Sequence, residues 1–76
     1  MRREASFLGI EKATIRQLRQ AAGLTQAELA HRVGVQTSQV SRWERGAATP
    51  TARNARKLAR RLGVTVDALE IAPPVR

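Results

Sequence analysis

The segment over residues 26–46 constrains the fold of this chain more than any other part of the sequence. Thr25 and Glu28 have the spacing of a capping box, in which the threonine hydroxyl accepts from the backbone amide of the glutamate and the glutamate side chain reaches back. Gly34 follows eight residues of helical pattern, and glycine takes left-handed backbone angles without steric cost. We therefore expect a helix from about Gln26 to Val33, then a sharp turn, then a second helix.

The second helix should run from about Thr37 to Arg45, because its apolar and polar residues fall on opposite sides. Val40 and Trp43 lie three positions apart on one side, where we expect them to pack in the core. The other side carries Ser38, Ser41, Arg42 and Arg45.

The polar side of this second helix suits the major groove of DNA. Thr37, Ser38 and Gln39 in its first turn are polar residues that can approach base edges without clashing. Arg42, one turn later, can present two donors to O6 and N7 of guanine. Gln36, just before the helix, is long enough to reach a base or a phosphate.

Other helices are predicted on both sides of this pair. A first helix should end near Ala22, before Gly23, with Ile15 and Leu18 facing the core. A short fifth helix, from about Val66 to Glu70, should follow the fourth.

The fourth helix has two candidate starts. Either Thr49 caps it, with Pro50 at the first helical position, or Thr51 caps it directly. Gly63 ends it. Its apolar stripe contains Ala52, Ala55, Leu58, Ala59 and Leu62, and its basic stripe contains Arg53, Arg56, Lys57, Arg60 and Arg61.

From Ile15 to Leu69 the sequence resembles the phage repressor and Cro family of helix-turn-helix domains, also called the XRE family. The matching segments are IRQLRQAAGLTQAELA, VGVQTSQVSRWERG and LARRLGVTVDAL. The resemblance implies an all-α, five-helix, lambda-repressor-like domain with the helix-turn-helix at its second and third helices. It also implies binding of double-stranded operator DNA as a symmetric homodimer, without a cofactor.

The resemblance also implies roles for single residues. Thr37, Ser38 and Arg42 match base-reading positions, Gln26 a phosphate-binding helix start, and Arg45 a position that contacts the DNA backbone. With the neighbours that the helix geometry adds, the expected DNA-binding residues are Gln26, Gln36, Thr37, Ser38, Gln39, Ser41, Arg42, Arg45 and Arg53.

Two structural expectations come from the same resemblance. Arg19 and Glu44 match an ion pair that ties the first helix to the recognition helix, and Thr51 is the favoured cap of the fourth helix. One residue departs from the family, because Gln36 stands where serine or threonine is usual and glutamine is a poor N-cap. Either Thr37 caps the recognition helix instead, or the start of that helix is loose until DNA arrives.

Length and charge limit the organisation of the chain. It has 76 residues and a net charge of +8. A chain of this size buries roughly 60% of its unfolded surface, enough for one core. We expect an N-terminal arm over residues 1–10, the helix-turn-helix domain over 11–70 and a C-terminal tail over 71–76, where Pro73 and Pro74 oppose helix.

The charge favours a polyanion as partner, with a membrane surface as the weaker choice because the fourth helix needs its alanines and leucines for the core. The basic stripe is a solvated face, a phosphate contact at its Arg53 end, or a docking surface for an acidic protein.

Without cysteine there is no disulfide or thiolate metal site, and His31 stands alone. No serine or threonine has a base partner, so we expect no enzyme. No signal peptide is visible, which predicts a cytoplasmic protein associated with the nucleoid.

Dimer contacts are expected around Val66, in the C-terminal region. Phe7, Leu8 and Ile10 either lead into the first helix and pack on the core or belong to a dimer contact. The sequence therefore predicts a sequence-specific transcriptional regulator, with a repressor as the favoured form. The alternatives are an antitoxin that also binds a toxin, and a control protein of a restriction-modification system.

Overall fold

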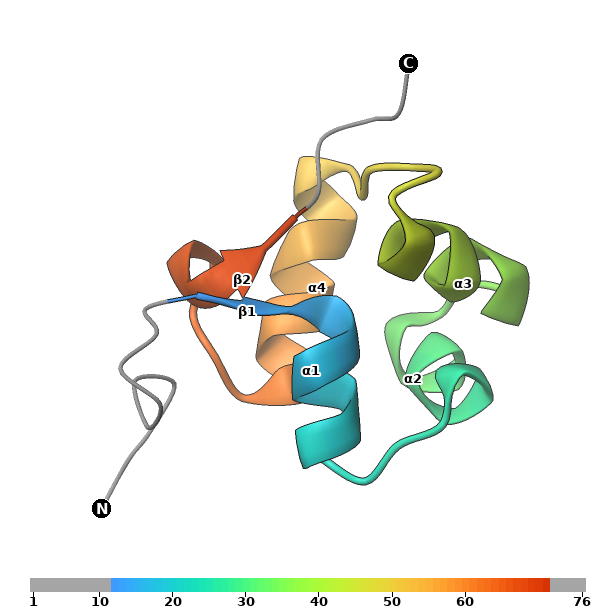
Figure 1. Cartoon of the computed structure of the whole chain (residues 1–76), viewed down its shortest axis with the longest axis horizontal. Coiled ribbons are helices and arrows are strands. Elements are labelled where there is room, and N and C mark those ends of the chain that lie inside the picture. Colours follow the sequence, from blue (N-terminus) through green and yellow to red (C-terminus); the bar gives the residue numbers. More distant parts are fainter. Residues whose placement is uncertain (1–11, 72–76) are drawn as a thin grey trace.

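Helices dominate the computed structural model, which describes residues 12–71 (Figure 1). The expected N-terminal arm with Phe7, Leu8 and Ile10, and the tail beyond Ile71, lie outside the described residues. In chain order the elements are β1 (Ala13–Thr14), α1 (Ile15–Ala21), α2 (Gln26–Val33), α3 (Thr37–Arg45), α4 (Ala52–Leu62), a 3-10 turn η1 (Val66–Ala68) and β2 (Leu69–Glu70). The expected bounds of the two helices at the centre of the sequence are confirmed.

Side-chain caps fix the starts of α2 and α4. The hydroxyl of Thr25 accepts from the amide of Glu28 at 3.0 Å, and the amide of Thr25 donates to the Glu28 carboxylate at 2.8 Å. This capping box confirms the prediction, and its hydrogen bonds lower the pKa of Glu28. The hydroxyl of Thr51 accepts from the amide of Asn54 at 3.1 Å, so Thr51 is the cap of α4. Gly34 ends α2 with φ +86°, in the left-handed region.

Helix α1 has a capping box that the sequence analysis missed. The Thr14 hydroxyl accepts from the amide of Gln17 at 3.0 Å, and the Thr14 amide donates to the Gln17 side chain at 2.9 Å. Threonine followed three residues later by glutamine is the sequence signature of such a box. At the other end, Ala22 is the C-cap, as expected.

The expected fifth α-helix over Val66 to Glu70 is not found, and this corrects the predicted count of five helices, while the mostly helical fold fits the all-α class. The segment is a 3-10 turn followed by β2, which pairs in parallel with β1, Ala13 opposite Leu69 and Thr14 opposite Glu70. Five residues form too few helical hydrogen bonds to offset the cost of nucleating a helix. In the extended conformation Leu69 reaches the core and is 5% exposed.

The core lies where α4 meets the other helices. Figure 1 shows α4 in the centre of the view, with α2 and α3 to its right and the strand pair to its left. Trp43 is 3% exposed, which confirms the core position predicted for it. The core cluster consists of Ile15, Leu29, Ala30, Val33, Val40, Trp43, Ala55, Leu58 and Leu69.

The apolar stripe of α4 is narrower than its sequence pattern predicts. Ala55, Leu58 and Ala59 are buried, but Leu62 is only half-buried and Ala52 is exposed. Ala52 is the first residue of the helix, directly after the cap, at an end of the helix that the other helices do not cover.

Candidate nucleic-acid interface

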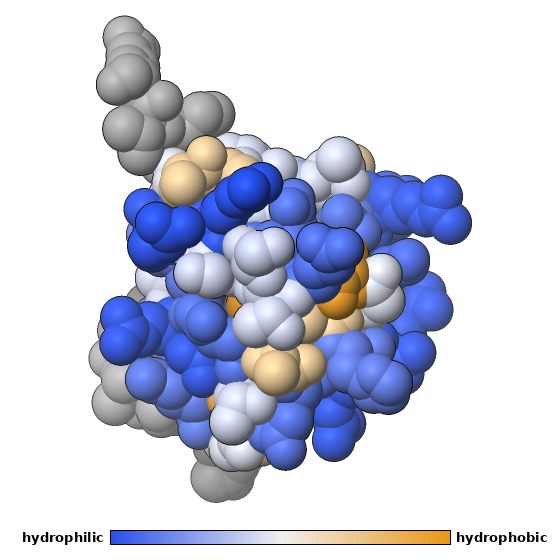
Figure 2. Space-filling view, turned by 90° about the vertical axis from the view of Figure 1, so that its right-hand side faces the viewer, coloured by the Kyte–Doolittle hydropathy of each residue, from blue (hydrophilic) through white to orange (hydrophobic). Residues whose placement is uncertain are grey.

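Helix α3 is fixed to the core along one side and leaves the other side free. Val40 and Trp43 are 0% and 3% exposed, and Gly46 ends the helix in a left-handed conformation with φ +76°. Figure 2 shows the side of the molecule on which α2 and α3 lie, and its surface is mainly hydrophilic, with white, tan and orange residues of higher hydropathy in the middle between blue ones. This combination of a packed side and a polar side is what a base-reading helix requires.

The predicted site residues fall into two groups by exposure. The exposed ones are Gln36, Thr37, Ser38, Arg42, Arg45 and Arg53, and the half-buried ones are Gln26, Gln39 and Ser41. Seven of them, from Gln36 to Arg45, come from α3 and its N-cap, whereas Gln26 opens α2 and Arg53 is the second residue of α4.

The start of α3 carries no side-chain cap. Gln36 occupies the N-cap position with φ −81° and ψ 152°, and only its backbone carbonyl takes part, accepting from the amide of Gln39 at 2.9 Å. Thr37 is the first residue inside the helix, so the alternative that Thr37 caps it is wrong. The exposed Gln36 side chain is therefore not engaged in holding the helix.

The two arginines of α3 differ in how they are held. The Nε of Arg45 donates to the backbone carbonyl of Ser41 at 3.4 Å, which directs the guanidinium along the helix. Arg42 is exposed and makes no ion pair with another residue of the described part of the chain. Its donors are free to bind a partner outside the domain.

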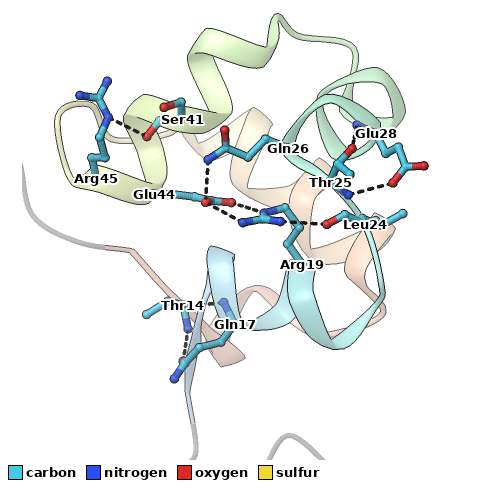
Figure 3. Close-up of polar contacts among 10 residues, drawn as sticks. All are labelled: Thr14, Gln17, Arg19, Leu24, Thr25, Gln26, Glu28, Ser41, Glu44 and Arg45. Atoms are coloured by element: carbon cyan, nitrogen blue, oxygen red, sulfur yellow. Dashed lines mark hydrogen bonds and ion pairs between the residues drawn. The ribbon is translucent and has the colours of Figure 1, made fainter.

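Glu44 joins three elements through one carboxylate (Figure 3). Its Oε2 lies 2.6 Å from Nε of Arg19, and its Oε1 accepts from Nη2 of Arg19 at 3.1 Å and from Nε2 of Gln26 at 2.9 Å. Arg19 also donates to the backbone carbonyl of Leu24 at 2.9 Å. The ion pair between Arg19 and Glu44 that the resemblance implied is thus confirmed.

Arg19 and Glu44 are nearly buried in this network, and both side chains are charged at neutral pH. The Arg19 and Glu44 side chains are 12% and 4% exposed. Burial raises the pKa of Glu44, but the hydrogen bonds from Arg19 and Gln26 and the charge of Arg19 outweigh it, so the net pKa lies below its usual value. The hydrogen bond to Glu44 raises the pKa of Arg19 further. The ion pair with Arg19 and the hydrogen bond from Gln26 therefore hold α1, α2 and α3 together through Glu44 at neutral pH.

The bond between Gln26 and Glu44 was missed by the sequence analysis, which assigned Gln26 to phosphate. The two residues are far apart in the sequence, so no local spacing reveals their contact. The Gln26 amide group is thus held by Glu44, and the backbone N–H groups of Gln26 and Ala27, in the first turn of α2, have no acceptor within the helix.

Among residues 12–71, no group of three or more His, Cys, Asp or Glu side chains could hold a metal ion. His31 is exposed in the last turn of α2. The helices of the described part are too short and too polar for any of them to cross a membrane.

The fold and the α3 surface together define a helix-turn-helix DNA-binding domain. A helix-turn-helix family model matches residues 15–69. The chain belongs to this family, the XRE-like helix-turn-helix domains, and is by that membership a DNA-binding domain of the transcription-regulator class. Searches of curated proteins and of solved structures gave no match.

Proposed function

We propose that this protein is a sequence-specific transcriptional repressor that binds operator DNA as a homodimer through the exposed side of α3. The observation that carries the proposal is the division of α3 into a buried apolar side and an exposed polar side that carries Arg42, which makes no ion pair with another described residue. Occupying an operator excludes polymerase without any further chemistry, so binding alone is sufficient for repression. Operator binding would also place the protein in the cytoplasm, on the nucleoid.

The proposed site residues have two roles, base reading and phosphate contact. Thr37, Ser38 and Arg42 read base edges, and Arg42 pairs with guanine through two hydrogen bonds. Gln39 and Ser41, half-buried beside them, complete the surface that faces the groove. Gln36 and Arg45 flank that surface and reach phosphates, which position the protein without reading sequence.

Two helix starts supply further phosphate contacts. The free backbone N–H of Gln26 lies at the positive end of α2, a favourable place for an anion. Arg53, exposed in the first turn of α4, adds a charged contact. Both contacts come from the N-terminal ends of helices, and these are the ends that this fold is expected to turn toward DNA.

The dimer contact is proposed at Val66. Among residues 12–71, Val66 is the large hydrophobic side chain that stands exposed, with 43% of its surface accessible. It lies in η1, beside the strand pair and away from the polar side of α3. A two-fold dimer through this region would present two copies of α3 to successive major grooves on one face of the duplex, about 34 Å apart.

Selection of bound sites from random DNA, followed by footprinting, tests this function. We expect an inverted repeat whose two half-sites are centred about one helical turn apart. Enrichment of a single unpaired half-site, with binding linear in protein concentration, would contradict the dimer. Absence of any enriched sequence would contradict sequence-specific binding itself.

The antitoxin and restriction-control alternatives use the same DNA-binding surface and add a second partner or a different target gene. A neighbouring toxin or nuclease gene would distinguish them from a stand-alone repressor. One basic surface of the molecule is a candidate site for a protein partner.

A further inference from the structure

A basic groove of about 210 Å³ lies between the end of α2 and the second half of α4. It is lined by His31, Arg32, Val33, Gly34, Lys57, Arg60 and Arg61. We call this surface the α2/α4 groove. Four of its seven lining residues carry a positive charge at neutral pH, and Val33 is a member of the core cluster.

The groove adjoins the surface proposed for DNA at Gly34, two residues before Gln36, but its charged residues come from other helix ends. That surface uses the N-terminal ends of helices, whereas the groove is formed by the last turn of α2 and the second half of α4. With a rise of about 1.5 Å per residue, Arg32 lies about 9 Å along α2 from Gln26, and Arg60 lies about 10 Å along α4 from Arg53.

The described part of the chain leaves most of the charge of the groove unneutralised. The salt bridge found among the described residues joins Arg19 to Glu44, and no acidic side chain lines the groove. The charge of Arg32 acts on one carboxylate, that of Glu28 one turn earlier on α2, and contributes to lowering the pKa of Glu28.

The helix dipole accounts for only part of this arrangement. Cations are favourable in the last turn of a helix, and α2 and α4 both end in basic residues. The dipole does not explain why the basic ends of two helices face one another across a concave surface, where their like charges repel and their field is focused. An anionic group in the groove would relieve this repulsion.

We propose that the α2/α4 groove binds the acidic side chains of a partner protein. Its volume is below the roughly 300–1,000 Å³ of typical small-molecule sites, so it accommodates inserted Asp or Glu side chains and not a cofactor-sized ligand. A duplex bound to α3 meets the opposite ends of these helices, which leaves the groove open to a second partner while DNA is bound. The proposal does not depend on which operator the protein recognises, or on whether it represses.

Two double variants with the same net charge test the proposal. Arg60→Gln with Arg61→Gln removes charge from the groove, and Arg53→Gln with Arg56→Gln removes the same charge from exposed positions of α4 outside it. The probes are a fluorescent octaglutamate peptide, its octaglutamine counterpart and a DNA duplex. Circular dichroism confirms that each variant retains its helices.

We expect octaglutamate to bind the parent protein, octaglutamine not to bind, and the groove variant to bind octaglutamate about tenfold more weakly. The Arg53 and Arg56 variant should keep its affinity for the peptide and lose affinity for DNA. In NMR titrations the peptide should shift the backbone amides of Val33 and Gly34 and not those of α3.

Three results would overturn the proposal. Equal loss of peptide binding in both double variants would mean that the peptide responds to net charge and not to the groove. Loss of DNA binding in the groove variant, as large as that in the Arg53 and Arg56 variant, would make the groove a phosphate contact. Failure of the parent protein to bind octaglutamate would also refute it, and none of these peptide results bears on operator recognition.

Discussion

The two helices of the helix-turn-helix begin in different ways. Helix α2 starts in a capping box closed from both sides by Thr25 and Glu28, whereas α3 starts at Gln36 with no side-chain hydrogen bond to its first turn. The second half of α3 is held instead, because Trp43 is 3% exposed and the Glu44 side chain 4% exposed. The comparison teaches that no side chain holds the first turn of α3, which stays available to DNA, whereas its second half carries the anchors Trp43 and Glu44 together with the exposed Arg42.

The sharpest way to break this comparison is to remove the anchor. Trp43→Ala leaves a cavity where a large side chain packed, and we expect a loss of about 3–5 kcal/mol in the free energy of unfolding. Small domains have total stabilities of only about 5–15 kcal/mol, so the variant should be largely destabilised in urea titrations. A variant that melts like the parent and loses only DNA binding would show that Trp43 is a surface contact.

The second anchor is the carboxylate of Glu44. Glu44→Ala leaves the Arg19 charge nearly buried without its partner, and we expect a cost of about 3 kcal/mol in the free energy of unfolding. The double variant Arg19→Met, Glu44→Met removes both charges and should recover part of this loss. If the losses of the single variants Arg19→Met and Glu44→Met simply add in the double variant, the pair does not couple α1 to α3.

Acid should weaken the same anchor. Because the folded-state pKa of Glu44 lies below its unfolded value, its contribution to stability is present above about pH 4.3 and is lost as the pH falls through the folded pKa. Unfolding midpoints measured from pH 6 downward should therefore fall in the parent, and fall less in Glu44→Gln. Parallel curves for the two proteins would mean that this carboxylate does not control acid stability.

The exposed side of α3 is tested through DNA and not through stability. Arg42→Ala should cost about 1–3 kcal/mol in specific binding and relax the base preference at one position in each half-site. Arg45→Ala, one turn removed and assigned to phosphate, should weaken all sequences alike. Equal loss of specific and non-specific binding in Arg42→Ala, measured side by side, would exclude the base-reading role.

The smallest effects concern the two helix starts themselves. Thr25→Ala removes a cap and should cost about 1 kcal/mol in the free energy of unfolding. Gln36→Ala should change it by less than about 0.5 kcal/mol, because no cap bond is lost. Similar losses for both variants would show that the start of α3 is supported as firmly as that of α2, and the comparison would fail.

What the sequence predicted well depends on neighbours along the chain. The capping box at Thr25 and the left-handed turn at Gly34 are local features, and they suffice for the bounds of α2 and α3. The core position of Trp43 follows from its helical spacing to Val40. The pair between Arg19 and Glu44 was predicted only through the family resemblance, because no local pattern links those residues.

What the sequence did not predict depends on contacts between distant segments. Gln26 meets Glu44 across the packed helices, and Leu69 meets Ala13 at the strand pair, so neither contact leaves a local signal. The exposure of Ala52 has the same origin, since helical spacing gives the side on which a residue lies but not where the neighbouring helices stop.

The parallel pairing of β1 with β2 also determines the order in which the molecule assembles. It joins the two ends of the described chain and so closes a long loop, and we expect that entropic cost to be met only after the helices have packed. We therefore expect this pair to form last during folding and to open first in the native state. In hydrogen exchange, its amides should lose their protons before those of α3, which means that the chain ends can detach while the recognition helix stays folded.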